Sequence, residues 1–188
     1  MRRATVADVI SWEPCGFDGE DDGENYTEAR LIRLAAGRKS LSILEILDLD
    51  IPAEDRIWVA LHLLDEREVR LWGCDCAERA LEHEREAGRE PDPRSWEAIR
   101  VSMLYAVGEA TSEELRLASA PARDAARDAY RGASWPTVRA AWSAWDAALG
   151  AGWDASADAA LAFDRDAARA AEREWQLARL VEYARGEA

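Results

Sequence analysis

The stretch from Asp65 to Ala87 constrains the fold of this chain more than any other part of the sequence. It is typical of a long helix with its own start and stop signals. Asp65 can act as the N-cap, and Glu68 stands where it can close a capping box. Gly88 follows as a residue that readily adopts the left-handed conformation at a helix end. The sequence therefore predicts one helix over Asp65–Ala87.

The apolar residues of this predicted helix cover more than half of its circumference. The residues that share this broad face at helical spacing are Val69, Trp72, Gly73, Cys74, Cys76, Ala77, Ala80, Leu81 and His83. A helix at the surface of a protein needs only a narrower apolar stripe. We therefore expect neighbouring helices to surround this one.

Similar signals recur before and after this stretch and favour an all-α protein. Another capping box begins at Thr111, and a short helix near Leu41–Leu47 is capped by Ser40 or by Ser42, which has Glu45 three residues after it. The Asp-Pro pair at residues 92–93 marks a further helix start. Pro121 lies inside the helix that Thr111 opens. We expect it to kink or break that helix, because an interior proline costs about 3 kcal/mol.

The last part of the chain is rich in alanine and tryptophan. Apolar side chains recur at helical spacing from Ser134 to Arg185, and Gly150 and Gly152 divide this region into two expected helices. Together the signals predict an all-α protein, an irregular or orthogonal helical bundle of about seven to nine helices. We expect a single domain with an irregular acidic arm over residues 1–24, a helical core over residues 25–132, and helices over residues 133–188 that pack on the core.

The chain is strongly acidic. It has 38 acidic and 24 basic side chains, which gives a net charge of −14. Such a charge repels nucleic acid and anionic membranes and attracts basic proteins, so we expect neither nucleic acid nor membrane as a direct partner. No signal peptide is recognisable at the start, and no apolar run approaches the ~20 residues of a membrane span, so we expect a cytoplasmic protein.

The sequence shows no recognisable catalytic or cofactor motif. Cys76 and His83 share one face of the predicted helix, but two turns separate them by ~10 Å, which is too far for direct proton transfer. The acidic loop before Tyr26 resembles the first half of a calcium loop, but Ala29 stands where a bidentate glutamate is needed. Cys74 and Cys76 have no metal-ligand spacing, and we expect them to be reduced core thiols. We therefore expect no enzyme, no metal and no cofactor.

Carboxylates gather in two places, which are the candidate partner-binding residues. The first is a loop that contains Asp18, Glu20, Asp21, Asp22 and Glu24. The second is a row along the polar edge of the predicted helix, formed by Asp75, Glu78, Glu82 and Glu86, with Arg79 placed to compensate Asp75 in part. The row is either an ordinary solvated helix face or a surface that imitates a track of phosphates.

Residues from about 40 to 131 resemble a known family. The runs that carry the resemblance are Leu41–Leu47, Asp55–Leu61, Leu71–Leu81, Pro93–Ile99 and Tyr105–Leu115. With the alanine-rich helices that follow, they are similar to the bacterial immunity proteins of polymorphic-toxin systems. The resemblance implies an all-α inhibitor that binds a partner protein and has no catalytic residues. Such genes also travel on phages and plasmids, so inhibition of a defence complex is an equally sensible use of the scaffold.

These observations lead to one leading hypothesis and one alternative. The first is a non-enzymatic, acidic inhibitor that neutralises a basic, nucleic-acid-binding effector, either a toxin nuclease or a CRISPR-type complex that it would block by DNA mimicry. The alternative is a structural or assembly module that forms a helical homodimer. In that case the tryptophan-rich helices around Trp142, Trp145 and Trp153 would form the contact.

Overall fold

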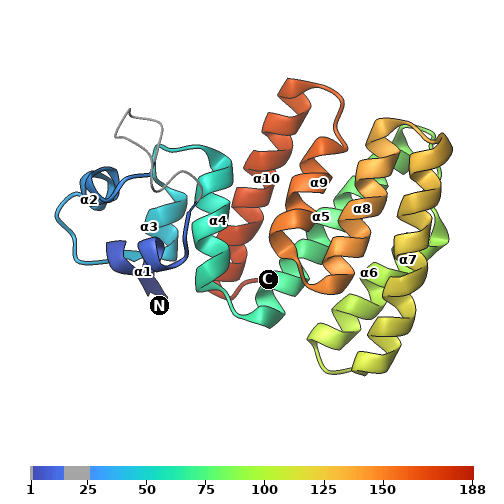
Figure 1. The fold of residues 1–188 in the computed structure, drawn as a ribbon, viewed down its shortest axis with the longest axis horizontal. Helices are drawn as coiled ribbons and strands as arrows, with labels where there is room; N and C mark the ends of the chain where they lie inside the picture. Colours follow the sequence, from blue (N-terminus) through green and yellow to red (C-terminus); the bar gives the residue numbers. More distant parts are fainter. Residues whose placement is uncertain (1, 15–25) are drawn as a thin grey trace. The chain divides into compact units, whose positions relative to one another are not determined.

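The structure, a computed structural model, describes residues 2–14 and 26–188 (Figure 1). These residues form ten helices and two short strands, so the chain is an all-α helical bundle protein, as its sequence predicts. Contacts divide the chain into two compact units, Met1–Leu64 and Asp65–Ala188. The division falls at Asp65, the N-cap of the long central helix.

The first unit contains a short antiparallel strand pair and four helices. β1 pairs with β2 so that Arg3 lies opposite Ser42. The elements are β1 (Arg3–Ala4), α1 (Val6–Ser11), α2 (Glu28–Ala35), β2 (Leu41–Ser42), α3 (Ile43–Leu47) and α4 (Ala53–Leu63). The expected irregular arm thus contains a strand and a helix in its described part, because Thr5 and Asp8 form a capping box that starts α1.

The core of the first unit joins the strand pair to α3 and to the flanking helices. Its buried residues are Ala4, Leu41 and Ile46, and the half-buried residues packed on them are Val9, Trp12, Leu49, Val59 and Leu63. The capping box predicted at Ser42 is present and starts α3.

The second unit is organised around α5 (Glu66–Glu86), which contacts four other helices, α6, α8, α9 and α10 (Figure 1). Asp65 and Glu68 form the predicted capping box, and Gly88 has a positive φ of 78°. The other helices are α6 (Pro93–Ala106), α7 (Ser112–Gly132), α8 (Trp135–Leu149), α9 (Gly152–Leu161) and α10 (Asp166–Arg185). The prediction that neighbouring helices surround this helix is confirmed.

Small residues let α9 approach α5 closely. A Cβ atom on Gly152 would lie 2.8 Å from Cγ1 of Val69 and 2.9 Å from its carbonyl oxygen, and one on Gly73 would lie 3.1 Å from the Cα of Gly152. Trp72 is fully buried, and its indole N–H donates to the Gln176 carbonyl oxygen at 3.2 Å. The broad apolar face of α5 is therefore packed on its neighbours.

Two expectations about helix ends differ from the structure. Pro121 does not break α7, which continues from Ser112 to Gly132, because the proline lies on the exposed side and removes only one backbone donor. The region after Ser134 forms three helices instead of two. The additional break follows Leu161, where Phe163 turns inward and is buried. Gly150 ends α8 in the left-handed conformation, as expected.

Candidate protein-binding surface

Three of the predicted acidic residues form an exposed edge on α5. Glu78, Glu82 and Glu86 are all exposed. They are spaced four residues apart, which is about 6 Å along a helix that rises 1.5 Å per residue. Because the opposite side of α5 is packed among other helices, the backbone holds the Cα atoms of these glutamates at a fixed spacing. We call Glu78, Glu82 and Glu86 the acidic edge.

Asp75, the fourth residue of the predicted row, lies elsewhere. Its side chain is only 17% exposed. Its Oδ2 accepts hydrogen bonds from Arg179 Nε at 2.8 Å and from the Tyr183 hydroxyl at 2.8 Å. Both partners belong to α10, so Asp75 joins α5 to α10 and is not part of the acidic edge.

The sequence analysis expected Arg79 to compensate the charge of Asp75 in part. In the structure Arg79 binds a different carboxylate. Its Nε donates to Oε2 of Glu172 at 2.6 Å, and its guanidinium lies 4.6 Å from the centre of the Trp175 ring. Glu172 is almost fully buried, and this burial raises the pKa of its carboxyl although Arg79 lowers it. The arginine is therefore engaged by a buried acid of α10 and is not placed to neutralise the acidic edge.

The three glutamates of the acidic edge lie close to other negative charges and to one arginine. Partial burial and the nearby charges of Glu82 and Asp75 raise the pKa of Glu78. Arg85 lies 3.5 Å from Glu82, but both side chains are about half exposed, and such a surface ion pair is worth little. The like charges thus repel one another and favour the approach of a cation.

Many other carboxylates of the second unit form ion pairs with arginine side chains. Arg89 binds the buried Glu84 through two hydrogen bonds of 2.6 and 2.8 Å. Other close ion pairs are formed by arginines of α6, α7 and α8. They include Arg94–Asp92, Arg100–Glu97, Arg116–Glu113 and Arg139–Asp158. The acidic edge differs from these places because it holds three exposed carboxylates and one weak ion pair.

The second predicted acidic group lies outside the described residues. It consists of Asp18, Glu20, Asp21, Asp22 and Glu24. Without these five carboxylates the net charge of −14 becomes −9, so the described part of the chain is still strongly acidic. The charge argument for a basic partner therefore does not depend on this loop alone.

The histidines and cysteines that were considered as catalytic or metal-binding residues pack against aromatic rings or are buried. His83 stacks on Phe163 with ring centres 4.2 Å apart, and His62 stacks on Trp12 at 4.6 Å. Burial raises the pKa of the Cys74 thiol to about 11 and raises the pKa of Cys76 well above its usual value. Within residues 2–14 and 26–188, no group of three or more His, Cys, Asp or Glu side chains could hold a metal ion.

Sequence reasoning missed a carboxylate cluster between α8 and α9. Asp146 is half-buried, and this burial together with the charges of Asp158 and Asp154 raises its pKa from 3.8 to about 7. Asp158 also binds Arg139 at 2.7 Å. The spacing of Asp154 and Asp158 was visible in the sequence, but the approach of Asp146 depends on how α8 and α9 pack.

The tryptophans considered for a homodimer contact are only half-buried. Trp142 and Trp145 contact each other edge to face with ring centres 5.1 Å apart, and Trp153 lies on α9.

Within the described ranges no helix is both long and apolar enough to cross a membrane.

No known protein family, no curated protein and no solved structure matches the chain. The function is therefore argued from the surface charge of α5 and from the surroundings of its residues. The resemblance to immunity proteins stays an expectation from the sequence.

Proposed function

We propose that the chain is a non-enzymatic inhibitor that binds a basic protein through the acidic edge of α5. The observation that carries the proposal is three exposed carboxylates on a helix whose other side is packed among its neighbours. The backbone of a packed helix is already ordered before binding, so only the glutamate side chains have to be ordered. Its charge also speeds the encounter with a cationic surface.

The charge density indicates what kind of basic surface fits. The acidic edge offers one carboxylate about every 6 Å, whereas duplex DNA carries one charge about every 1.7 Å. The edge alone therefore matches part of a nucleic-acid channel and not a whole duplex. We infer that the effector is a basic, nucleic-acid-binding protein. The resemblance described above favours a toxin nuclease, and a CRISPR-type complex is a second effector of the same chemistry.

Inhibition assays with charge variants test this proposal. Purified polymorphic-toxin nucleases and a CRISPR nuclease complex are incubated with the chain, and plasmid cleavage is measured between roughly 50 and 200 mM salt, where electrostatic binding changes strongly. The test variant combines Glu78→Gln, Glu82→Gln and Glu86→Gln. The matched control combines Asp48→Asn, Asp50→Asn and Glu90→Gln, which removes the same charge from three other exposed positions.

We expect the chain to inhibit one of these nucleases, with inhibition that weakens as salt rises. The acidic-edge variant should need about tenfold more protein for half inhibition, because several charge contacts are lost together. The control variant should inhibit like the unchanged chain. Equal inhibition by all three proteins would contradict the proposed role of the acidic edge.

A further inference from the structure

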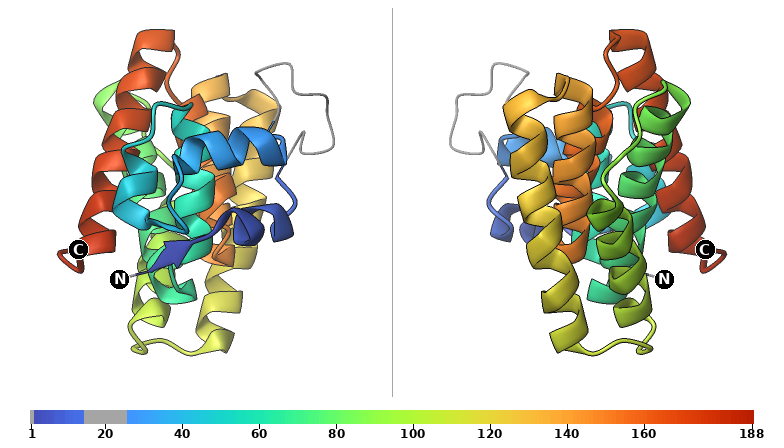
Figure 2. Two further views of the ribbon diagram at one scale, coloured as in Figure 1. Left: turned by 90° about the vertical axis from the view of Figure 1, so that its left-hand side faces the viewer. Right: turned by 90° about the vertical axis from the view of Figure 1, so that its right-hand side faces the viewer.

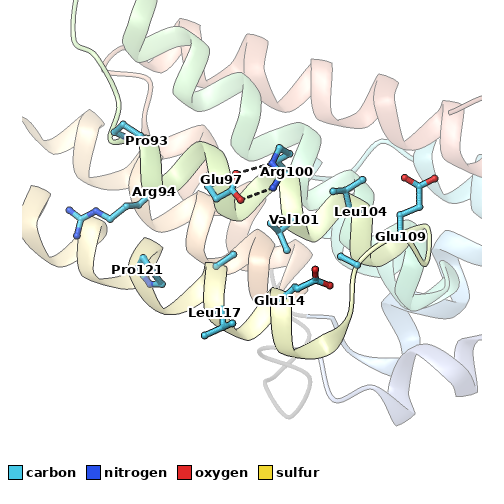
Figure 3. A pocket seen from close by; sticks show the side chains of 12 residues that line it. Pro93, Arg94, Glu97, Arg100, Val101, Leu104, Glu109, Glu114, Leu117 and Pro121 are labelled. Atoms are coloured by element: carbon cyan, nitrogen blue, oxygen red, sulfur yellow. Dashed lines mark hydrogen bonds and ion pairs between the residues drawn. The ribbon is translucent and has the colours of Figure 1, made fainter.

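A groove of about 580 Å³ lies between α6 and α7 of the second unit (Figure 3). The two helices form a hairpin that is joined by a short turn (Figure 2). The apolar residues that line the groove are Pro93, Val101, Leu104, Ala110, Leu117, Ala118 and Pro121. A groove of this size accommodates several partner side chains.

The α7 wall of the groove offers an exposed apolar contact. Leu117 is 57% exposed although it is a large apolar residue. Pro121 follows it by one helical turn and has no backbone N–H, so the Leu117 carbonyl lacks its usual helical donor. Both residues line the groove, and Figure 3 shows Leu117 across from Val101 of α6. This wall therefore fits an apolar side chain of a partner.

The charges around the groove favour a cationic donor. Arg100 is held by two hydrogen bonds from its guanidinium to Glu97, at 2.6 and 2.8 Å. Arg94 donates to Asp92 at 2.7 Å and to Asp128 at 3.0 Å.

Glu109 and Glu114, at the end of the groove near the turn, differ from these pairs. In the described part of the chain neither is paired with an arginine, although Glu114 accepts hydrogen bonds from Thr111 in a capping box. The two arginines that line the groove are thus engaged by carboxylates, and two glutamates remain unmatched.

We propose that this groove binds a basic amphipathic segment of a partner protein. A leucine- or methionine-sized side chain lies on the apolar floor beside Leu117, and neighbouring lysine or arginine side chains reach Glu109 and Glu114. This segment and the effector of the proposed function are both positively charged. The groove is a separate surface, however, and the inference does not depend on the acidic edge.

Peptide binding to the full chain tests the inference. Three labelled peptides of one helical pattern are compared by fluorescence anisotropy: one with leucine and arginine, one with leucine and glutamate, and one with serine and arginine. The test variants are Leu117→Ser and Glu109→Gln. The control is Leu149→Ser, because Leu149 is 51% exposed on α8 and does not line the groove.

We expect the leucine–arginine peptide to bind more tightly than the other two. Leu117→Ser should weaken it about tenfold, since the contact buries roughly 60 Å² of apolar surface. Glu109→Gln should weaken it less and should reduce its salt dependence. Leu149→Ser should change nothing, and all variants should keep the helical circular dichroism of the unchanged chain because the replaced side chains are exposed.

Three results would overturn the inference. The first is equal binding of the leucine–glutamate peptide, and the second is equal binding by Leu117→Ser and Leu149→Ser. The third is a concentration-dependent dimer in sedimentation that Leu117→Ser alone abolishes, because a second copy would then occupy the groove. The Glu78/Glu82/Glu86 variant should still bind the peptide. If the same variant also inhibited the nuclease as well as the unchanged chain does, that result would contradict the proposed function and leave the groove inference unaffected.

Discussion

Replacement of Asp146 tests the packing of α8 against α9 through the pH dependence of stability. Burial and the charges of Asp158 and Asp154 raise its pKa from 3.8 to about 7. Between these two pH values the folded chain holds a proton that the unfolded chain has lost. Its contribution to stability is therefore fully present below about pH 4 and is lost as the pH rises through 7.

The size of the effect follows from the same shift. A difference of about three pH units corresponds to about 4 kcal/mol at 1.36 kcal/mol per unit. The side chain is only half-buried, and solvent screens its charge, so we expect about 1–2 kcal/mol in practice. Asp146→Asn should therefore raise the free energy of unfolding by that amount at pH 8.5 and change it little at pH 4.

Urea unfolding followed by circular dichroism measures both values. The difference between variant and unchanged chain is compared at the two pH values, so that acid effects on other carboxylates cancel. Asp154→Asn is the matched control, because Asp154 is exposed and only contributes its charge to the cluster. It should stabilise the chain less than Asp146→Asn at pH 8.5. A stability difference that is the same at both pH values would refute the reasoning.

Two further predictions concern the packing around α5. Gly152→Ala should destabilise the chain by about 1–3 kcal/mol in urea unfolding, because the new Cβ meets Val69. Gly132→Ala should change stability little, because a Cβ at Gly132 has nothing within 4 Å. Equal effects of the two variants would contradict the close approach of α9. In a Cys15→Ser variant, Cys74 and Cys76 should react with Ellman's reagent only after unfolding, since both are buried and their thiol pKa values are raised; rapid reaction of the folded chain would contradict this packing.

The sequence was most informative where local signals decide the structure. The capping boxes at Asp65, Ser42 and Thr111 depend on residues three positions apart, and all three start helices in the structure. The same rule applied to Thr5 and Asp8 would have located α1. The broad apolar face of α5 likewise predicts its central position, because only burial explains so wide a face.

The sequence was less informative where the outcome depends on contacts between distant segments. Asp75 and Glu78 look equivalent along α5, yet Asp75 faces Arg179 of α10, more than a hundred residues away. The turn near Phe163 has no glycine or proline to mark it, and it forms where the phenylalanine can be buried. Residue spacing on one helix therefore identified the candidate row, whereas tertiary packing determined which of its members are exposed.

The central claim is that Glu82 is available to a partner, whereas Asp75 belongs to the interior contact with α10. Once an inhibited nuclease has been found, calorimetric titration with Glu82→Gln and Asp75→Asn, together with their free energies of unfolding, tests this claim most directly. The account predicts weaker binding with unchanged stability for Glu82→Gln, and lower stability with unchanged affinity of the folded protein for Asp75→Asn. The reverse pattern, or equal affinity for both variants, would contradict it.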